Sequence, residues 1–229
     1  MFVPVQQSTP LQRYFTIAAI AVIPIVIAGF VPLYTLRLLH HDPLLTVRVQ
    51  AHGLVMASWI ALFLVQTQLI ARGHPDLHRK LGAFAAPLVI AMLTISIPVL
   101  LDAAARKAHG AHGAPFYLRL VAFDGVNLLL FACLAALAVA MRFRSDYHKR
   151  LMLLATLSLL GPAFGRLTSY ANGMSGDNDL AVLLLMLGCL GVAATIDIVG
   201  LRRFHPAWIL GALPVAAADL LTYLAKTQL

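Results

Sequence analysis

Hydrophobic residues gather in seven long runs along the chain, and short polar segments separate these runs. Each run has roughly the 20 residues that a helix needs to cross the ~30 Å hydrocarbon layer of a bilayer. A membrane β-barrel would instead show segments of about ten residues with alternating polarity, a pattern the sequence lacks. The runs predict an all-α, polytopic integral membrane protein with a single domain over residues 1–229. Its seven transmembrane helices are expected at 14–36, 49–71, 78–101, 118–141, 148–171, 180–201 and 206–225.

The composition supports the same class of protein. Apolar residues make up 61% of the chain and charged residues 11%, whereas an average soluble domain is about 25% charged. The mean hydropathy is +0.86. Such a chain has too little polar surface to cover a globule in water, so a soluble protein is excluded. Cys133 and Cys189 fall inside apolar runs, which predicts buried thiols and no disulfide framework.

The net charge of +8 arises from 17 Lys and Arg residues against nine acids, all of them Asp. A basic balance is also typical of nucleic-acid binding, but here the charges lie between apolar runs rather than along one polar face. We therefore expect the lipid bilayer, and no nucleic acid, as a partner. Ten basic residues fall on the side of the helices that holds the N-terminus and seven on the other. The positive-inside rule then predicts a cytoplasmic N-terminus.

A six-residue motif occurs twice, 70 residues apart. The pattern D-x-H-[RK]-[RK]-L spans residues 76–81 and 146–151, and each copy follows a long apolar run and a short polar loop. We interpret the two copies as the trace of an internal duplication. The duplication predicts a core of four helices, formed by 49–71, 78–101, 118–141 and 148–171.

Two readings of the repeated motif are open. In the first, Asp76 and Asp146 cap helix N-termini and the basic pairs hold the helix ends at lipid headgroups. In the second, His78 and His148 face each other and are the axial ligands of a haem b, as in membrane b-type cytochromes. Four neighbouring basic residues would then pair with the haem propionates: Arg79, Lys80, Lys149 and Arg150.

One stretch of the chain carries an H…W…Q…HR-x-LG pattern followed by a second histidine motif. Its residues are His52, Trp59, Gln66 or Gln68, His78, Arg79, Leu81, Gly82 and the run from His148 to Met152. On these residues the chain resembles bacterial multi-helix membrane proteins of unknown function, over a little more than half of its length. More distantly it is similar to the ascorbate-dependent transmembrane cytochromes b, whose four central helices carry two His pairs. The resemblance implies a bacterial inner-membrane location and one haem at His78 and His148, with Asp124 opposite His52 in place of a second pair.

A second group of polar residues is expected at the opposite membrane face. His52 lies 19 residues before the end of its run, or about 29 Å at 1.5 Å per residue. Asp124 lies near the start of the 118–141 run and Arg166 near the end of 148–171, so both reach the level of His52. Ionisable residues inside a membrane usually mark a pathway or a site. Either Asp124 and Arg166 form a self-contained ion pair, or all three form a catalytic or binding site open to the periplasm. Asn127, Ser169 and Tyr170 are expected nearby.

Loop histidines add a metal alternative on that same face. His40 and His41 lie in the first outer loop, and His109 and His112 lie in the second. Together with His52 they offer ligands for zinc or copper.

The sequence thus leaves two functions open. The leading hypothesis is a small b-type cytochrome-like protein that exchanges electrons with quinone or a small reductant. The alternative is a non-redox membrane protein, either a small-solute transporter or a metal-dependent hydrolase, built around His52, Asp124 and Arg166.

Overall fold

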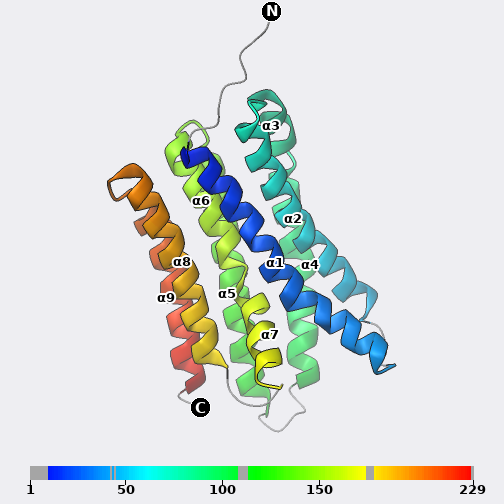
Figure 1. Cartoon of the computed structure of the whole chain (residues 1–229). Helices are drawn as coiled ribbons and strands as arrows, with labels where there is room; N and C mark the ends of the chain where they lie inside the picture. Colours follow the sequence, from blue (N-terminus) through cyan, green and yellow to red (C-terminus); the bar gives the residue numbers. More distant parts are fainter. Residues whose placement is uncertain (1–9, 42, 44, 108–112, 174–177, 228–229) are drawn as a thin grey trace, which may run out of the picture.

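The computed structural model describes residues 10–41, 43, 45–107, 113–173 and 178–227. Within these residues every regular element is a helix, and no strand occurs (Figure 1). This confirms the all-α prediction. The helices are α1 (Pro10–Leu39), α2 (Val47–Ala71), α3 (Pro75–Gly82), α4 (Ala85–Lys107), α5 (Gly113–Ala140), α6 (Ser145–Ser158), α7 (Gly161–Ala171), α8 (Asp179–Leu201) and α9 (Ala207–Thr227).

Two of the expected helices are broken rather than continuous. The expected 78–101 helix is divided at residues 83–84 into α3 and α4, and 148–171 is divided at 159–160 into α6 and α7. At both breaks the backbone N–H groups bond to carbonyls three residues back instead of four. A proline follows each break, Pro87 or Pro162, and its missing N–H removes one bond of the regular helical ladder. The helix pair α3 and α4 nevertheless forms one continuous apolar segment, and so does the pair α6 and α7.

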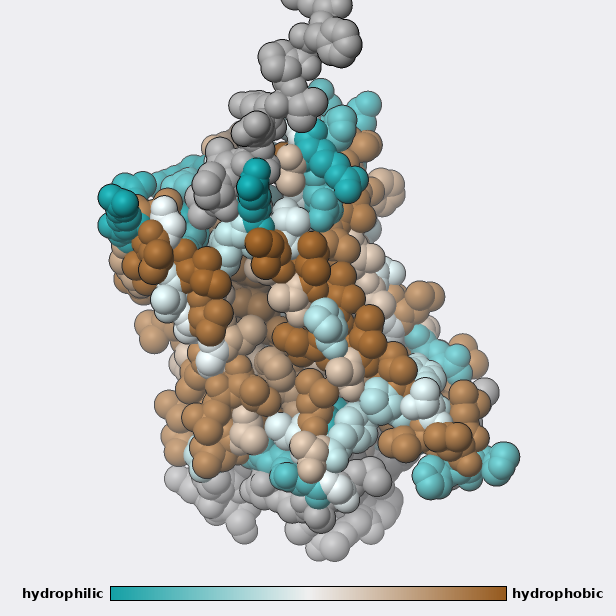
Figure 2. Space-filling model, viewed as in Figure 1, coloured by the Kyte–Doolittle hydropathy of each residue, from teal (hydrophilic) through white to brown (hydrophobic). Residues whose placement is uncertain are grey.

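Six helical segments of the described chain are long and apolar enough to cross a membrane. They are Arg13–Leu39, Val47–Ala71, Pro75–Ala105, Ser145–Ala171, Asp179–Leu201 and Ala207–Ala225. The remaining expected span corresponds to α5, which contributes the shorter apolar segment Asp124–Ala140. Figure 2 shows hydrophobic residues over most of the visible face, with hydrophilic residues gathered toward its two ends. Such an outer surface suits a lipid environment better than water.

The helices lie side by side in one elongated bundle (Figure 1). α5 packs on α4 and α6, α2 packs on α1 and α4, and α8 packs on α9. We call the end where α1, α3, α6 and α9 begin the N-terminal end of the bundle, and the other the opposite end. Consecutive hairpins, as a duplication would produce, are present in α2–α4 and α5–α6, but the duplication itself stays a prediction.

The centre of the core is α6. Its residues from Leu153 to Ser158 are all buried, because α1, α5, α8 and α9 surround the helix. Trp59 of α2 reaches this core, where its indole N–H donates to the hydroxyl of Thr156 at 3.2 Å. Both cysteines are free thiols, but Cys133 is exposed on α5, so its predicted burial was wrong.

Candidate functional site

The imidazole rings of His78 and His148 face each other at the N-terminal end of the bundle. Each histidine is the fourth residue of its helix, α3 or α6, since the repeated motif starts both helices in the same register. The ring centres are 6.2 Å apart, the ring planes are perpendicular, and both side chains are half-buried. The sequence repeat therefore corresponds to a real juxtaposition in space.

Hydrogen bonding distinguishes the ring nitrogens of the pair. Nδ1 of His148 lies 2.7 Å from the carbonyl oxygen of Ala138. Because a carbonyl only accepts, Nδ1 carries the hydrogen, which leaves Nε2 of the neutral ring with a free lone pair. Nδ1 of His78 is buried and has no hydrogen-bond partner in the described structure.

These features fit two ligands of one metal centre. Histidine ligands usually donate their second ring N–H to a carbonyl or carboxylate, as His148 does. A metal–imidazole bond is about 2 Å long, so two imidazoles on opposite sides of one ion have ring centres on the order of 6 Å apart. The observed spacing between His78 and His148 is of that size. This spacing is compatible with two histidine ligands of one iron, and the assignment of a haem to the pair stays a prediction.

The basic residues beside the histidines differ in whether they are free to pair with a haem propionate. Arg79 is exposed and pairs with Asp76 in its own helix. Nζ of Lys149 lies 5.4 Å from the centre of the Phe15 ring, a cation–π contact. Arg150 is buried and occupied, so it is not available for the propionate pairing expected of it.

The partner of Arg150 is a residue that the sequence interpretation missed. Asp197 of α8 is fully buried, and its two carboxylate oxygens accept from Nε and Nη2 of Arg150, both at 2.7 Å. The indole N–H of Trp208 donates to the same carboxylate at 2.8 Å. Nη1 of Arg150 donates to the carbonyl of Asp146 at 2.6 Å. This network joins α6, α8 and α9 just beneath the histidine pair.

A second polar cluster lies toward the opposite end, where the sequence placed it. Nδ1 of His52 lies 3.1 Å from the hydroxyl of Ser96. Arg166 is near enough to both His52 and Asp124 to interact with each electrostatically. Its guanidinium lies over the Phe30 ring at 4.4 Å, and its Nη1 donates to a carbonyl of its own helix at 2.9 Å. Arg166 thus interacts at long range with both His52 and Asp124, and a site formed by all three residues stays a prediction.

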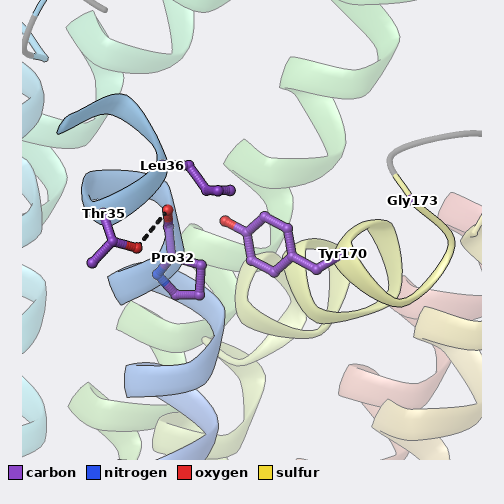
Figure 3. Close-up of a pocket in the computed structure, with 5 residues that line it drawn as sticks. All are labelled: Pro32, Thr35, Leu36, Tyr170 and Gly173. Atoms are coloured by element: carbon purple, nitrogen blue, oxygen red, sulfur yellow. Dashed lines mark hydrogen bonds between the residues drawn. The ribbon is translucent and has the colours of Figure 1, made fainter. Parts of the chain in front are cut away.

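A pocket of about 320 Å³ lies next to this cluster, between α1 and α7. Pro32, Thr35 and Leu36 form one wall, and Tyr170, one turn after Arg166, forms the other (Figure 3). The hydroxyl of Thr35 is bonded to the carbonyl of Pro32 at 3.2 Å and is therefore directed to its own helix.

The described residues supply no set of ligands for a zinc or copper ion. Among them, no group of three or more His, Cys, Asp or Glu side chains is close enough to hold a metal ion. His109 and His112 lie outside the described residues, so their part in the alternative stays a prediction.

Comparisons with known protein families, with curated proteins and with solved structures find no match for this chain. The fold and its surface define the class: an all-helical protein with six segments that are long and apolar enough to cross a membrane. The resemblance to transmembrane cytochromes b stays a prediction from the sequence.

Proposed function

We propose that the chain is a small b-type cytochrome-like redox protein of the bacterial inner membrane, in which His78 and His148 hold a haem. The observation that carries the proposal is the imidazole pair, whose ring centres lie 6.2 Å apart although the residues are 70 positions apart in sequence. The excess of basic residues at the N-terminal end favours a cytoplasmic position for this site.

When bound, a haem with two imidazole ligands would accept and release single electrons. The contribution of the chain's own residues is positional. The Ala138 carbonyl fixes the ring orientation of His148, and the first turn of α3 leaves Leu77, next to His78, 52% exposed. A small reductant or a quinone headgroup can approach from this side. Arg79 and Lys149 each follow a ligand directly and would balance the charge of the propionates.

Haem content of purified variants tests the proposal. Wild-type protein from haem-replete cells should carry iron in a stoichiometric amount, and His78→Ala and His148→Ala should each lose most of it. His74→Ala is the matched control, because His74 is exposed at the same end and its side chain makes no capping bond. Iron-free wild-type protein would contradict the proposal, as would equal iron content in the His148→Ala and His74→Ala proteins.

The cluster at the opposite end supports a second candidate function. His52, Asp124 and Arg166 come from three different helices, and Arg166 interacts electrostatically with each of the other two. Ionisable residues inside a membrane span usually mark a transport pathway or a site. Elemental analysis separates the candidates. Stoichiometric iron favours the cytochrome, zinc or copper favours a metal site that includes His52, and the absence of all three metals favours transport.

Whether Asp124 and Arg166 form an ion pair is tested by a double substitution. Asp124→Asn should lower the melting temperature in detergent, because it leaves the positive charge of Arg166 uncompensated inside the span. Adding Arg166→Gln should recover part of the loss. A double variant that melts no higher than the worse single variant would show that the two residues act separately.

A further inference from the structure

A second pocket, of about 210 Å³, lies at the N-terminal end beside the start of α6. The α5–α6 turn and α6 contribute part of its lining, and the connection from α8 to α9 contributes the rest. The lining residues are Arg144, Asp146, Tyr147, Arg203, Phe204, His205 and Pro206. The histidine pair is not among them, so this pocket is separate from the proposed haem site.

Two arginines provide the positive charge of this pocket. Both Arg144 and Arg203 are exposed, and neither forms a salt bridge with any described residue. The guanidinium of Arg144 is held over the Tyr147 ring at 4.3 Å. Arg203 follows Arg202, whose left-handed backbone (φ 54°) ends α8 and turns the chain into the pocket wall.

The acidic residue of the pocket is already occupied. A carboxylate oxygen of Asp146 lies 3.0 Å from Nε2 of His205. Nδ1 of His205 accepts from the backbone N–H of Ala207 at 3.2 Å, so Nε2 carries the hydrogen and donates to Asp146. Asp146 contributes one negative charge to the lining and the two arginines contribute two positive charges, so the pocket keeps a net positive charge. Neither guanidinium is paired with this carboxylate, so both can bind an anion from outside the chain.

We infer that this pocket binds a phosphate group. Two guanidinium groups suit phosphate oxygens, which they can bind through several N–H donors at once. The favoured source is the headgroup of an anionic lipid. Phe204 lines the pocket and Phe143 directly precedes Arg144, and they are 53% and 85% exposed. Exposed apolar side chains beside basic residues are typical of a protein surface that lies at a lipid interface. Free inorganic phosphate offers the same chemistry and is the other source.

The test uses full-length protein in detergent, with the melting temperature and native mass spectrometry as readouts. Phosphatidylglycerol should raise the melting temperature and remain bound, whereas phosphatidylcholine should do neither. Arg203→Gln and Arg144→Gln should each weaken phosphatidylglycerol binding about fivefold, since a basic residue near an anionic surface contributes about 1 kcal/mol. Arg142→Gln is the control, because Arg142 is exposed nearby but lies outside the pocket lining, over Phe143.

The outcomes are distinct. Stabilisation by inorganic phosphate alone, lost in Arg203→Gln, would keep the phosphate site and assign it to the free ion. An equal loss in Arg142→Gln and Arg203→Gln would show diffuse surface attraction and overturn the proposal. Binding of phosphatidylglycerol no tighter than that of phosphatidylcholine, with no response to phosphate, would also overturn it. None of these outcomes depends on haem binding.

Discussion

The two copies of the repeated motif begin α3 and α6 in the same register, yet they have different surroundings. In the first copy, Asp76 pairs with Arg79 of its own helix, and both side chains are largely exposed. In the second copy, Asp146 accepts from His205 and Arg150 is buried against Asp197. The first copy lies at the edge of the bundle on α2, whereas α1, α5, α8 and α9 cover the second.

The two copies differ in their contacts although they share a sequence pattern, so a short repeat determines only part of the local structure. The shared pattern sets the start of each helix and brings His78 and His148 to one level. The neighbouring helices decide what the basic residues do. Lys80 and Arg150 occupy the same position of the motif, but only Arg150 meets a buried carboxylate.

Substitution at this shared position should give the largest effect. Arg150→Gln leaves Asp197 buried without its cation, which should cost about 3–5 kcal/mol of stability. Lys80→Gln, at an exposed position, should change stability little. Thermal melting in detergent measures both. Adding Asp197→Asn to Arg150→Gln should recover part of the loss, and equal effects of Lys80→Gln and Arg150→Gln would refute the contrast between the copies.

The difference between two glycines, one beside each copy, should be intermediate in size. A Cβ on Gly211 of α9 would lie 2.5 Å from Cδ1 and 3.2 Å from Cβ of Leu154, which is fully buried in α6. Gly211→Ala should therefore cost about 1–3 kcal/mol through overpacking. A Cβ on Gly82, next to the first copy, would meet only Nε2 of the Gln66 side chain, at 3.3 Å. Nε2 of Gln66 donates to the carbonyl of His78 at 3.2 Å, so Gly82→Ala should disturb that single bond and cost less than Gly211→Ala in the same melting experiment. A loss as large as that of Gly211→Ala would contradict the looser packing of the first copy.

The aspartates of the two copies should give the smallest difference. Asp146→Ala removes the acceptor of the buried His205 N–H, at a cost of about 1 kcal/mol. Asp76→Ala removes an exposed pair within one helix and should not change the melting temperature measurably. Equal losses in Asp76→Ala and Asp146→Ala would show that the aspartate of the second copy contributes no more to stability than that of the first, against the contrast between the copies.

Most of the fold could be predicted from the sequence, because helix length and apolar character are local properties. The breaks at 83–84 and 159–160 could also have been found, since Pro87 and Pro162 lie in the first turn after them. Counting helix depth placed His52, Asp124 and Arg166 at one level, and Arg166 does interact electrostatically with the other two.

The Arg150–Asp197 pair was not predicted, although counting residues along each helix places both at a similar depth. Arg150 is the sixth residue of α6 and Asp197 is the fifth from the end of α8, so both lie near the N-terminal end. Which helices are neighbours is a tertiary property that depth alone does not supply. His205 was missed because it lies between the apolar runs, and only the Asp146 and Tyr147 contacts reveal its burial.

We propose that His78 and His148 are two ligands of one haem iron. The most direct measurement is the absorption spectrum of purified wild-type protein from haem-replete cells, before and after reduction with dithionite. We expect a Soret band in the oxidised protein and a sharp α band on reduction, both lost in His148→Ala and retained in His74→Ala. A colourless wild-type protein with the melting behaviour of a folded chain would contradict the proposal.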